Sequence, residues 1–309
     1  MRGKIWQAVK QGIRKGLRTA VWLLKFMIPV SLAVTLLAWS GGLEKLGAWL
    51  APLFQAFGLP GQSAVPYISA VLLNNYSGIG AMGLIPFDHR QVTILAMMML
   101  ICHNLPLEAT IQHKAGTSGP RMVLLRIAMS LFAGLLLNWA LPADPAGAHT
   151  IASVSTMRLA LWPTLAAWAM GIAWLAGKLA LILVGLMILQ QLLQDLGLIP
   201  WIARAIAPLL WLLGLPRSVA FLWIVANVLG LGFGAAVIIE EIESGALSDE
   251  DVDLLNHSIA VCHSLLEDTL LFVAIGAWGF WITVPRLLLA GAAVWAFRGW
   301  LSLKPTTDY

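Results

Sequence analysis

Two short stretches of the chain carry side chains that can bind a solute, a proton or a metal ion. Each stretch starts with a Cys-His pair and reaches a carboxylate within the next six residues. The first contains Cys102, His103, Asn104, Glu108 and Thr110, and the second contains Cys262, His263, Ser264, Glu267, Asp268 and Thr269. Both lie in apolar surroundings, where an ionisable group costs at least a few kcal/mol and therefore usually faces a cavity or a partner. We expect the two sets to meet and to form one site.

This pattern of residues allows three kinds of site. Carboxylates and imidazoles can hydrogen-bond a polar substrate or carry a coupling proton, which makes a solute site the favoured interpretation. Thiols and imidazoles from both stretches (Cys102, His103, Cys262 and His263) could instead bind a soft metal ion. The third interpretation is structural, with each histidine bonding a carboxylate and fixing a broken helix.

A third polar stretch consists of Asn74, Asn75, Tyr76, Ser77 and Gly78. Its counterpart in the second part of the chain, residues 228–232, is apolar, apart from the nearby Asn227. Amide side chains can recognise both donors and acceptors on a ligand. We therefore expect the polar copy, with a contribution from Asn227, to recognise the solute while the apolar copy only gates. The alternative is that Asn and Ser simply cap a broken helix.

Seven of the fifteen acidic residues fall between positions 240 and 253. Oxygen ligands of this kind suit a divalent cation. A helix start is the preferred interpretation, with Ser248 as the N-cap and Asp251 at the capping-box position. The same segment could also serve as a docking surface.

The elements that must position these residues are membrane helices. Of the 309 residues, 60% are hydrophobic and 11% are charged, whereas a soluble domain averages about 25% charged residues. This composition excludes a soluble enzyme, a disordered chain and a nucleic-acid binder, and two cysteines exclude a disulfide scaffold. The chain contains no phosphate-binding glycine loop, nucleophile elbow or H-E-x-x-H motif, so we expect no enzymatic activity. The sequence predicts an all-α polytopic protein with the lipid bilayer as its main partner.

The apolar stretches locate the expected spans. Residues 1–18 are predicted to form a basic amphipathic helix on the membrane surface, followed by a first span over 19–39. Glycines and prolines interrupt several later stretches, and irregular backbone at membrane depth requires shielding by protein or a cavity. We therefore expect re-entrant hairpins over 62–85 and 218–239, and broken helices around the two Cys-His pairs.

Sequence blocks recur in the same order at offsets of 154 to 160 residues. Ala51-Pro52-Leu53 matches Ala207-Pro208-Leu209, and Cys102-His103 matches Cys262-His263. Glu108-Ala109-Thr110 aligns with Glu267-Asp268-Thr269 if one residue is skipped. The chain is therefore predicted to contain two repeats, residues 1–145 and 157–303, joined by a linker at 146–156 and followed by a tail at 304–309.

The distribution of basic residues predicts that the second repeat is inverted. If the hairpins return to their own side, the segments 1–18, 111–126, 196–217 and 298–309 are cytoplasmic and hold most of the Lys and Arg residues, including Arg126. Both termini are then cytoplasmic, in a bacterial inner membrane. If the two hairpins cross fully, the repeats become parallel. Inverted repeats with broken helices at the midplane are typical of secondary transporters.

The chain resembles the gate, or nucleoside-recognition, domain of concentrative nucleoside transporters, ferrous-iron transporters and spore-maturation membrane proteins. The resemblance rests on residues 75–81 leading to Cys102-His103 and Glu108, and on residues 232–234 leading to the block 262–269. It implies a gate-like repeat in each half, and it implies that Asn74 to Gly78, with the segments His103–Glu108 and His263–Thr269, hold solute and a coupling ion such as sodium. The nucleoside-binding signature of the transporters has no match here, so the resemblance implies the domain and leaves the substrate open.

Together these observations predict a membrane transporter for a small polar or amphipathic solute, and a nucleoside-like solute is one possibility. A proton or sodium ion would be the coupling ion, with no other cofactor, and homo-oligomer formation is left open. Two alternatives remain: a divalent-metal permease of the ferrous-iron type, and a non-transporting factor for membrane assembly or envelope maintenance.

Overall fold

The protein is all-α in the computed structural model, which describes residues 2–142 and 160–303. The predicted linker at 146–156 and tail at 304–309 lie outside these residues. The first half contains α1 (Arg2–Trp39), α2 (Gly42–Gln55), the 3-10 turn η1 (Gly61–Ser63), α3 (Ala64–Leu72), α4 (Asn75–Met82), α5 (His89–Cys102), α6 (Leu105–Lys114) and α7 (Gly119–Ala140). The second half contains α8 (Leu161–Asp195), α9 (Leu198–Leu210), η2 (Trp211–Leu213), η3 (Arg217–Val219), α10 (Ala220–Val228), α11 (Gly230–Glu243), α12 (Asp249–Val261), α13 (Glu267–Ala274) and α14 (Gly279–Leu303).

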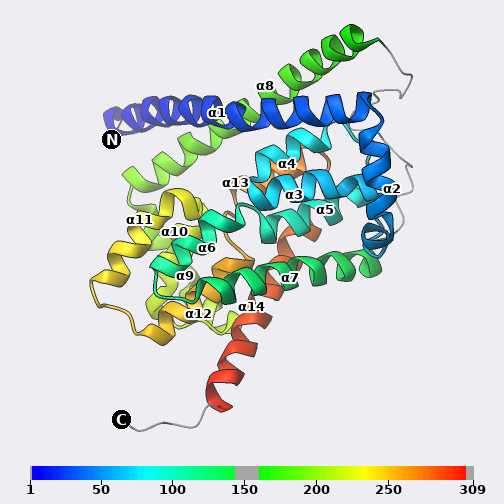
Figure 1. The fold of residues 1–309 in the computed structure, drawn as a ribbon. Coiled ribbons are helices and arrows are strands. Elements are labelled where there is room, and N and C mark those ends of the chain that lie inside the picture. The colour runs from blue at the N-terminus through cyan, green and yellow to red at the C-terminus, as the bar shows by residue number, and fades with distance from the viewer. Residues whose placement is uncertain (1, 143–159, 304–309) are drawn as a thin grey trace.

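The predicted fold class is confirmed. Among the described residues, five helical stretches are long and apolar enough to cross a bilayer: α1, α5 continued by α6, α7, α8 and α14. Figure 1 shows α1 and α8 along one side of the molecule, α7 and α14 towards the opposite side, and the short helices between them. The two halves contain their major helices in the same order, which is the order that the repeat predicts.

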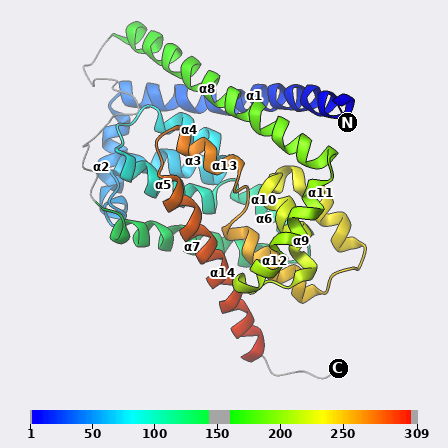
Figure 2. The same cartoon turned by 180° about the vertical axis from the view of Figure 1, so that it is seen from behind.

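Helices α1 and α8 pack against each other in antiparallel directions. Near one end of the pair Lys15 bonds Gln191, and near the other Trp168 bonds Ser31. Small residues allow a close approach, since a Cβ atom on Gly12 would lie 2.5 Å from the Cα of Ile188. The crossing is visible from both sides of the molecule (Figures 1 and 2). An antiparallel pair of first helices is the arrangement that inverted repeats require.

The first helix differs from the prediction in one respect. The expected surface helix over 1–18 and the expected span over 19–39 form one continuous helix, α1. No capping residue or proline separates them, and Pro29 lies ten residues further along, inside the helix. The basic residues therefore extend a membrane helix instead of forming a separate one.

Each half contains a hairpin of two short helices within the expected stretches 62–85 and 218–239. A glycine marks the break in the second half, whereas Gly78 and Gly80 of the first half lie inside α4. Helix α3 is followed by α4 after a break at Leu73 and Asn74, and α10 is followed by α11 after Leu229. Gly230, with φ of 77°, permits the second turn because only glycine adopts this conformation freely. None of these arms reaches the roughly 20 residues that a full crossing needs.

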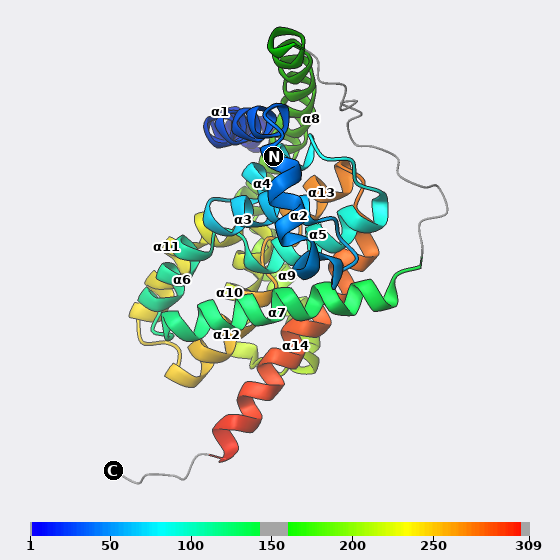
Figure 3. The same cartoon turned by 45° about the vertical axis from the view of Figure 1, so that its right-hand side comes forward.

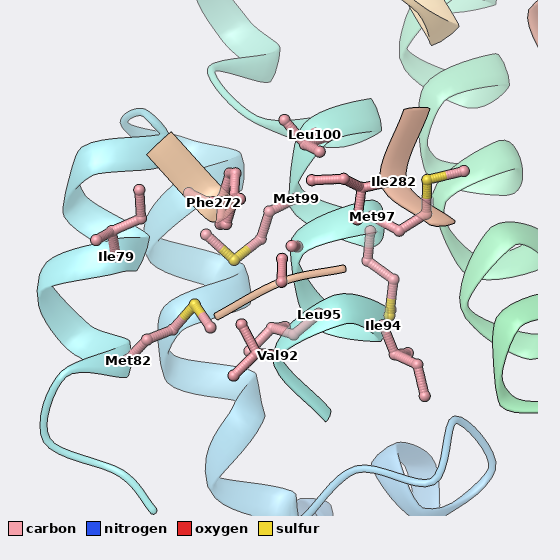
Figure 4. Packing of buried hydrophobic residues seen from close by; sticks show 14 of the residues in the cluster. Ile79, Met82, Val92, Ile94, Leu95, Met97, Met99, Leu100, Phe272 and Ile282 are labelled. Atoms are coloured by element: carbon pink, nitrogen blue, oxygen red, sulfur yellow. The ribbon is translucent and has the colours of Figure 1, made fainter. Parts of the chain in front are cut away.

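The broken helices occupy the centre of the fold. Eleven consecutive residues of α5, Val92 to Cys102, are buried, and a helix that is apolar on every side belongs inside a protein. Figure 4 shows part of this packing, in which Met97, Met99 and Leu100 of α5 lie near Phe272 of α13 and Ile282 of α14. Figure 3 shows α6 beside α11 and α13 near α4 and α5. The second segment of each broken helix therefore contacts the other half, α6 through α11 and α13 through α5 and the Tyr76–Glu267 hydrogen bond to α4.

Candidate functional site

The site is built on the breaks in the two central helices. After α5 the chain turns at Asn104 (φ 50°), and after α12 it turns at Ser264 (φ 51°). Positive φ is uncommon for residues other than glycine. Each turn is held by the same backbone bond, because the N–H of Asn104 donates to the Ala70 carbonyl at 2.8 Å and that of Ser264 donates to the Ala226 carbonyl at 3.0 Å. The turn residues therefore tie each break to the hairpin of its own half.

The first turn after each break presents one buried carboxylate. The backbone N–H of Glu108 donates to the Asn104 carbonyl, and that of Asp268 donates to the Ser264 carbonyl. Asp268, and not Glu267, is therefore the counterpart of Glu108, and the one-residue gap in the sequence alignment is wrong. The offset of 160 that relates the Cys-His pairs continues without interruption. Glu108 is 4% exposed and Asp268 is 5% exposed.

The two histidines point into the same space. The Nδ1 atom of His103 lies 3.1 Å from the Met99 carbonyl, and that of His263 lies 2.7 Å from the Ile259 carbonyl. This contact leaves each Nε2 atom facing the carboxylates. His103 Nε2 lies 3.4 Å from Glu108 Oε1 and 3.5 Å from Asp268 Oδ2, and His263 Nε2 lies 3.2 Å from Glu108 Oε2. The two predicted stretches thus come together across the boundary between the halves.

Arg126 completes the cluster and was misplaced by the sequence analysis. Its side chain is fully buried, with Nη1 2.7 Å from Glu108 Oε2. Its other nitrogens donate to the carbonyls of Ile101 and His103, both at 2.8 Å. The basic residues predicted Arg126 at the end of a cytoplasmic segment, whereas it lies inside the protein, within the candidate span Gly119–Ala140, where a carboxylate and two carbonyls replace its water. A matching arginine at the same offset, Arg286, was the signal that could have revealed it.

Arg286 is equally buried and has fewer partners. Its Nη2 donates to Thr269 Oγ1 at 3.2 Å, and it lies beside the Cys262 thiol. Its Nε and Nη1 atoms have no hydrogen-bond partner in the described part of the chain. The carboxylate that corresponds to Glu108 in this half, Asp268, lies instead within 3.5 Å of His103.

Glu267 lies outside this cluster. It accepts a hydrogen bond from the Tyr76 hydroxyl and lies beside the Gln190 side chain. Tyr76 is on α4, Gln190 is on α8 and Glu267 starts α13, so this carboxylate joins three elements.

The polar residues of the hairpin tip differ in role. Asn74 is structural, whereas Asn75 is available to contact a ligand. Asn74 caps α4, its Oδ1 accepting from the Ser77 backbone N–H at 3.0 Å and from the Ser77 hydroxyl at 3.1 Å. Gly78 packs closely, since a Cβ there would meet the Met99 methyl group at 2.2 Å. Asn75 is 1% exposed and lies beside Asp268. Of this stretch, Asn75 is the residue whose amide faces the buried carboxylates.

The remaining candidates lie further from the cluster. Asn227 is buried and donates to the Trp223 carbonyl, leaving its Oδ1 without a partner. Thr110 is exposed, and its hydroxyl donates to the Pro106 carbonyl. The cysteines are both buried and reduced. In the part of the chain that the structure describes, the group suited to a metal ion consists of His103, His263 and Asp268, with ligand atoms within 4.8 Å of one another and no cysteine among them.

The acidic segment begins a helix, as expected. The Ser248 hydroxyl accepts from the Asp251 backbone N–H, which confirms the predicted N-cap of α12. Asp253 pairs with Arg121 of α7 at 2.6 Å, so this helix also joins the two halves at the surface.

Comparison with known proteins agrees with this architecture. Residues 20–121 match the Gate family, described as nucleoside recognition. A protein described as the uncharacterized membrane protein YvoD of Bacillus subtilis is 32% identical over 268 residues, which cover 86% of each chain. No solved structure matches the chain.

Proposed function

Because the chain belongs to the gate, or nucleoside-recognition, family of membrane proteins, we propose that it is a secondary transporter for a small polar or amphipathic solute. The observation that carries this proposal is the buried cluster of Glu108, Asp268, His103, His263 and Arg126, to which both halves contribute. Moving a charge out of water costs several kcal/mol, and a buried ion pair seldom stabilises a fold more than apolar packing does. Such a cluster at membrane depth marks a pathway for a solute or proton.

Each residue of the cluster has a definite role in this proposal. Arg126 holds one oxygen of Glu108, and the imidazoles of His103 and His263 face both carboxylates. Hydroxyl or amine groups of a solute would replace these contacts, and Asn75 would offer its amide from the hairpin tip. A coupling proton would reside on a histidine or a carboxylate of the cluster.

Movement of one half against the other gives the cluster access to each side in turn. The halves meet along α1 and α8, around the central cluster, and through α6 with α11 and α13 with α4. The short hairpins are the elements that can cover or uncover the cluster. Rocking about the α1–α8 crossing would exchange which hairpin does so.

Reconstitution into liposomes tests the proposal. Uptake of a defined mixture of nucleosides, amino acids and organic acids would be measured by mass spectrometry, with and without a proton or sodium gradient. We expect the wild-type protein to accumulate at least one solute, and Glu108→Gln to reduce that uptake at least tenfold. Lys114→Gln removes a charge from an exposed position on the same helix, α6, and should retain uptake. Equal uptake by wild-type and empty liposomes across the mixture would contradict the proposal.

A divalent-metal permease is the second candidate, supported by the geometry of His103, His263 and Asp268. Two imidazoles and one carboxylate suit borderline metal ions such as Zn²⁺ or Fe²⁺. The metal would be the cargo of the protein. This version does not require Cys102 or Cys262, in contrast to the expectation from sequence.

Thermal unfolding with added metal distinguishes the two candidates. Binding stabilises the folded state in proportion to the logarithm of ligand concentration. A permease predicts that Mn²⁺ or Zn²⁺ raises the melting temperature of the wild-type protein and of Cys102→Ala, and that His263→Ala abolishes the increase. A melting temperature unchanged by metal would contradict the permease.

A further inference from the structure

A cavity separate from the charge cluster lies between α1, α8, α9 and the α10–α11 hairpin. Its volume is about 640 Å³, and ligand sites typically measure about 300–1,000 Å³. Its lining includes Lys15 and Arg18 of α1, Gln190 and Gln191 of α8, and Phe221 and Val225 of α10.

One end of this cavity is positively charged. Lys15 and Arg18 are three residues apart on α1 and so are neighbours on one face of the helix. No acidic residue is among the described residues that line the cavity. The nearest acid in the bonded network is Asp195, which Lys15 reaches only through Gln191. Among residues 2–142 and 160–303, Arg18 has no ion pair.

The opposite walls of the cavity are apolar. Phe221 and Val225 of α10 and Leu229 at the hairpin break face it. A ligand that fits both ends carries an anionic group on an apolar body. Basic pockets between membrane helices recognise anionic head groups by this combination.

Gln190 connects this cavity to the rest of the protein. Its Nε2 donates to the Val228 carbonyl at 2.6 Å, at the break between α10 and α11. The same side chain lies beside Glu267, which accepts a hydrogen bond from the Tyr76 hydroxyl. Gln190 therefore contacts both the hairpin break and the start of α13, and a ligand bound in the cavity would contact Gln190.

We propose that this cavity binds an amphipathic anion, with a carboxylate, phosphate or sulfonate group between Lys15 and Arg18 and an apolar part against α10. An anionic membrane lipid and a soluble amphipathic anion share this chemistry. Occupancy fixes Gln190 and thereby the α10–α11 break.

Thermal unfolding of the full-length protein in a neutral detergent tests the binding. Dihexanoyl phosphatidylglycerol is the lipid probe and indole-3-acetate is the soluble probe. Dihexanoyl phosphatidylcholine and tryptamine provide a similar apolar body without a net negative charge. We expect at least one anionic probe to raise the melting temperature and neither counterpart to do so. The probe that acts identifies the source, and failure of both overturns the proposal.

Paired substitutions on α1 locate the site. Lys15→Gln with Arg18→Gln should weaken the apparent affinity about 30-fold, since each basic residue contributes roughly a factor of five near an anionic lipid. Lys4→Gln with Lys10→Gln removes the same charge from exposed positions of the same helix outside the cavity and serves as the control. Equal losses in the two double variants would show general attraction to α1 and overturn the assigned site.

Hydrogen exchange tests the role of Gln190. The active probe should slow exchange in peptides that cover residues 226–231, and Gln190→Leu should remove this protection while leaving the melting-temperature increase in place. Protection that persists in Gln190→Leu would overturn the link to the hairpin. No transport measurement enters these experiments, so their outcome is independent of the proposed transport activity.

Discussion

Arg126 and Arg286 occupy equivalent positions in the two halves and have different surroundings. Arg126 is held by a carboxylate and two carbonyls, whereas Arg286 bonds one hydroxyl and leaves Nε and Nη1 without partners. The carboxylate in the second half is an aspartate, one methylene shorter than Glu108, and it lies by His103 of the first half. Similar backbones can therefore place charge asymmetrically through small changes in side-chain length.

The largest expected effect on stability comes from removing each arginine in turn. Arg126→Leu leaves Glu108 without its charge partner and should lower the free energy of unfolding by about 3–5 kcal/mol, the usual effect of breaking a buried ion pair. Arg286→Leu removes a cation that has no ion pair within residues 2–142 and 160–303, so its effect should be much smaller or even stabilising. Denaturant unfolding in detergent measures both. Equal losses would show that the two sites are energetically equivalent.

Lengthening the second carboxylate should make the halves alike. We expect the longer side chain of Asp268→Glu to approach Arg286, and a hydrogen bond between charged groups contributes about 1.5–3 kcal/mol, partly offset by the extra methylene. We expect a stabilisation of about 1–2 kcal/mol in unfolding experiments, together with slower solute uptake because Asp268 leaves His103. Glu108→Asp is the reciprocal control and should destabilise. If Asp268→Glu is no more stable than the wild-type protein, the longer side chain does not pair with Arg286.

The hairpin tips provide a comparison of helix starts. Asn74 caps α4 with its side chain, whereas α11 starts after Leu229 without a side-chain cap. Asn74→Ala should cost about 1 kcal/mol of stability, as measured by thermal unfolding. Asn74→Ser retains a capping oxygen and should cost less. If the two variants lose uptake equally while differing in stability, Asn74 also contacts the solute.

The smallest effect is expected at the surface contact between the halves. The side chains of Arg121 and Asp253 are 32% and 25% exposed, so water screens their ion pair. A double-mutant cycle with Arg121→Gln and Asp253→Asn should give a coupling of about 0.2–1 kcal/mol that decreases as salt is added. A salt-independent coupling would place this pair in the same class as Arg126 and Glu108.

The sequence predicted the breaks in the helices because their causes are local. Gly230 needs a positive φ, Asn74 caps a helix, and Ser248 caps another. The recurrence of the Cys-His pairs also identified the two stretches that meet at the centre. These features depend on residue types within a few positions of one another.

Features that depend on a distant partner could not be predicted from the sequence. Counting basic residues placed Arg126 outside the membrane because an unpaired cation inside it is costly, and no local pattern shows that Glu108 lies 2.7 Å away. Glu267 was paired with Glu108 because the two residues are identical, while the backbone bond of Asp268 to Ser264 gives the true register. The inverted orientation in the membrane and the cytoplasmic termini stay predictions.

The division of the charge cluster between the halves also bears on how the protein is made. During synthesis, the first half carries His103, Glu108 and Arg126 into the membrane before His263 and Asp268 exist, so Glu108 depends at that stage on Arg126 of its own half. Helix α6 can pack on α7 and α3 of its own half before α11 follows. The insertion machinery or lipid must therefore shelter a half-finished polar surface until roughly another 150 residues have followed α6, which takes about 8–30 s for a polypeptide elongating at about 5–20 residues per second.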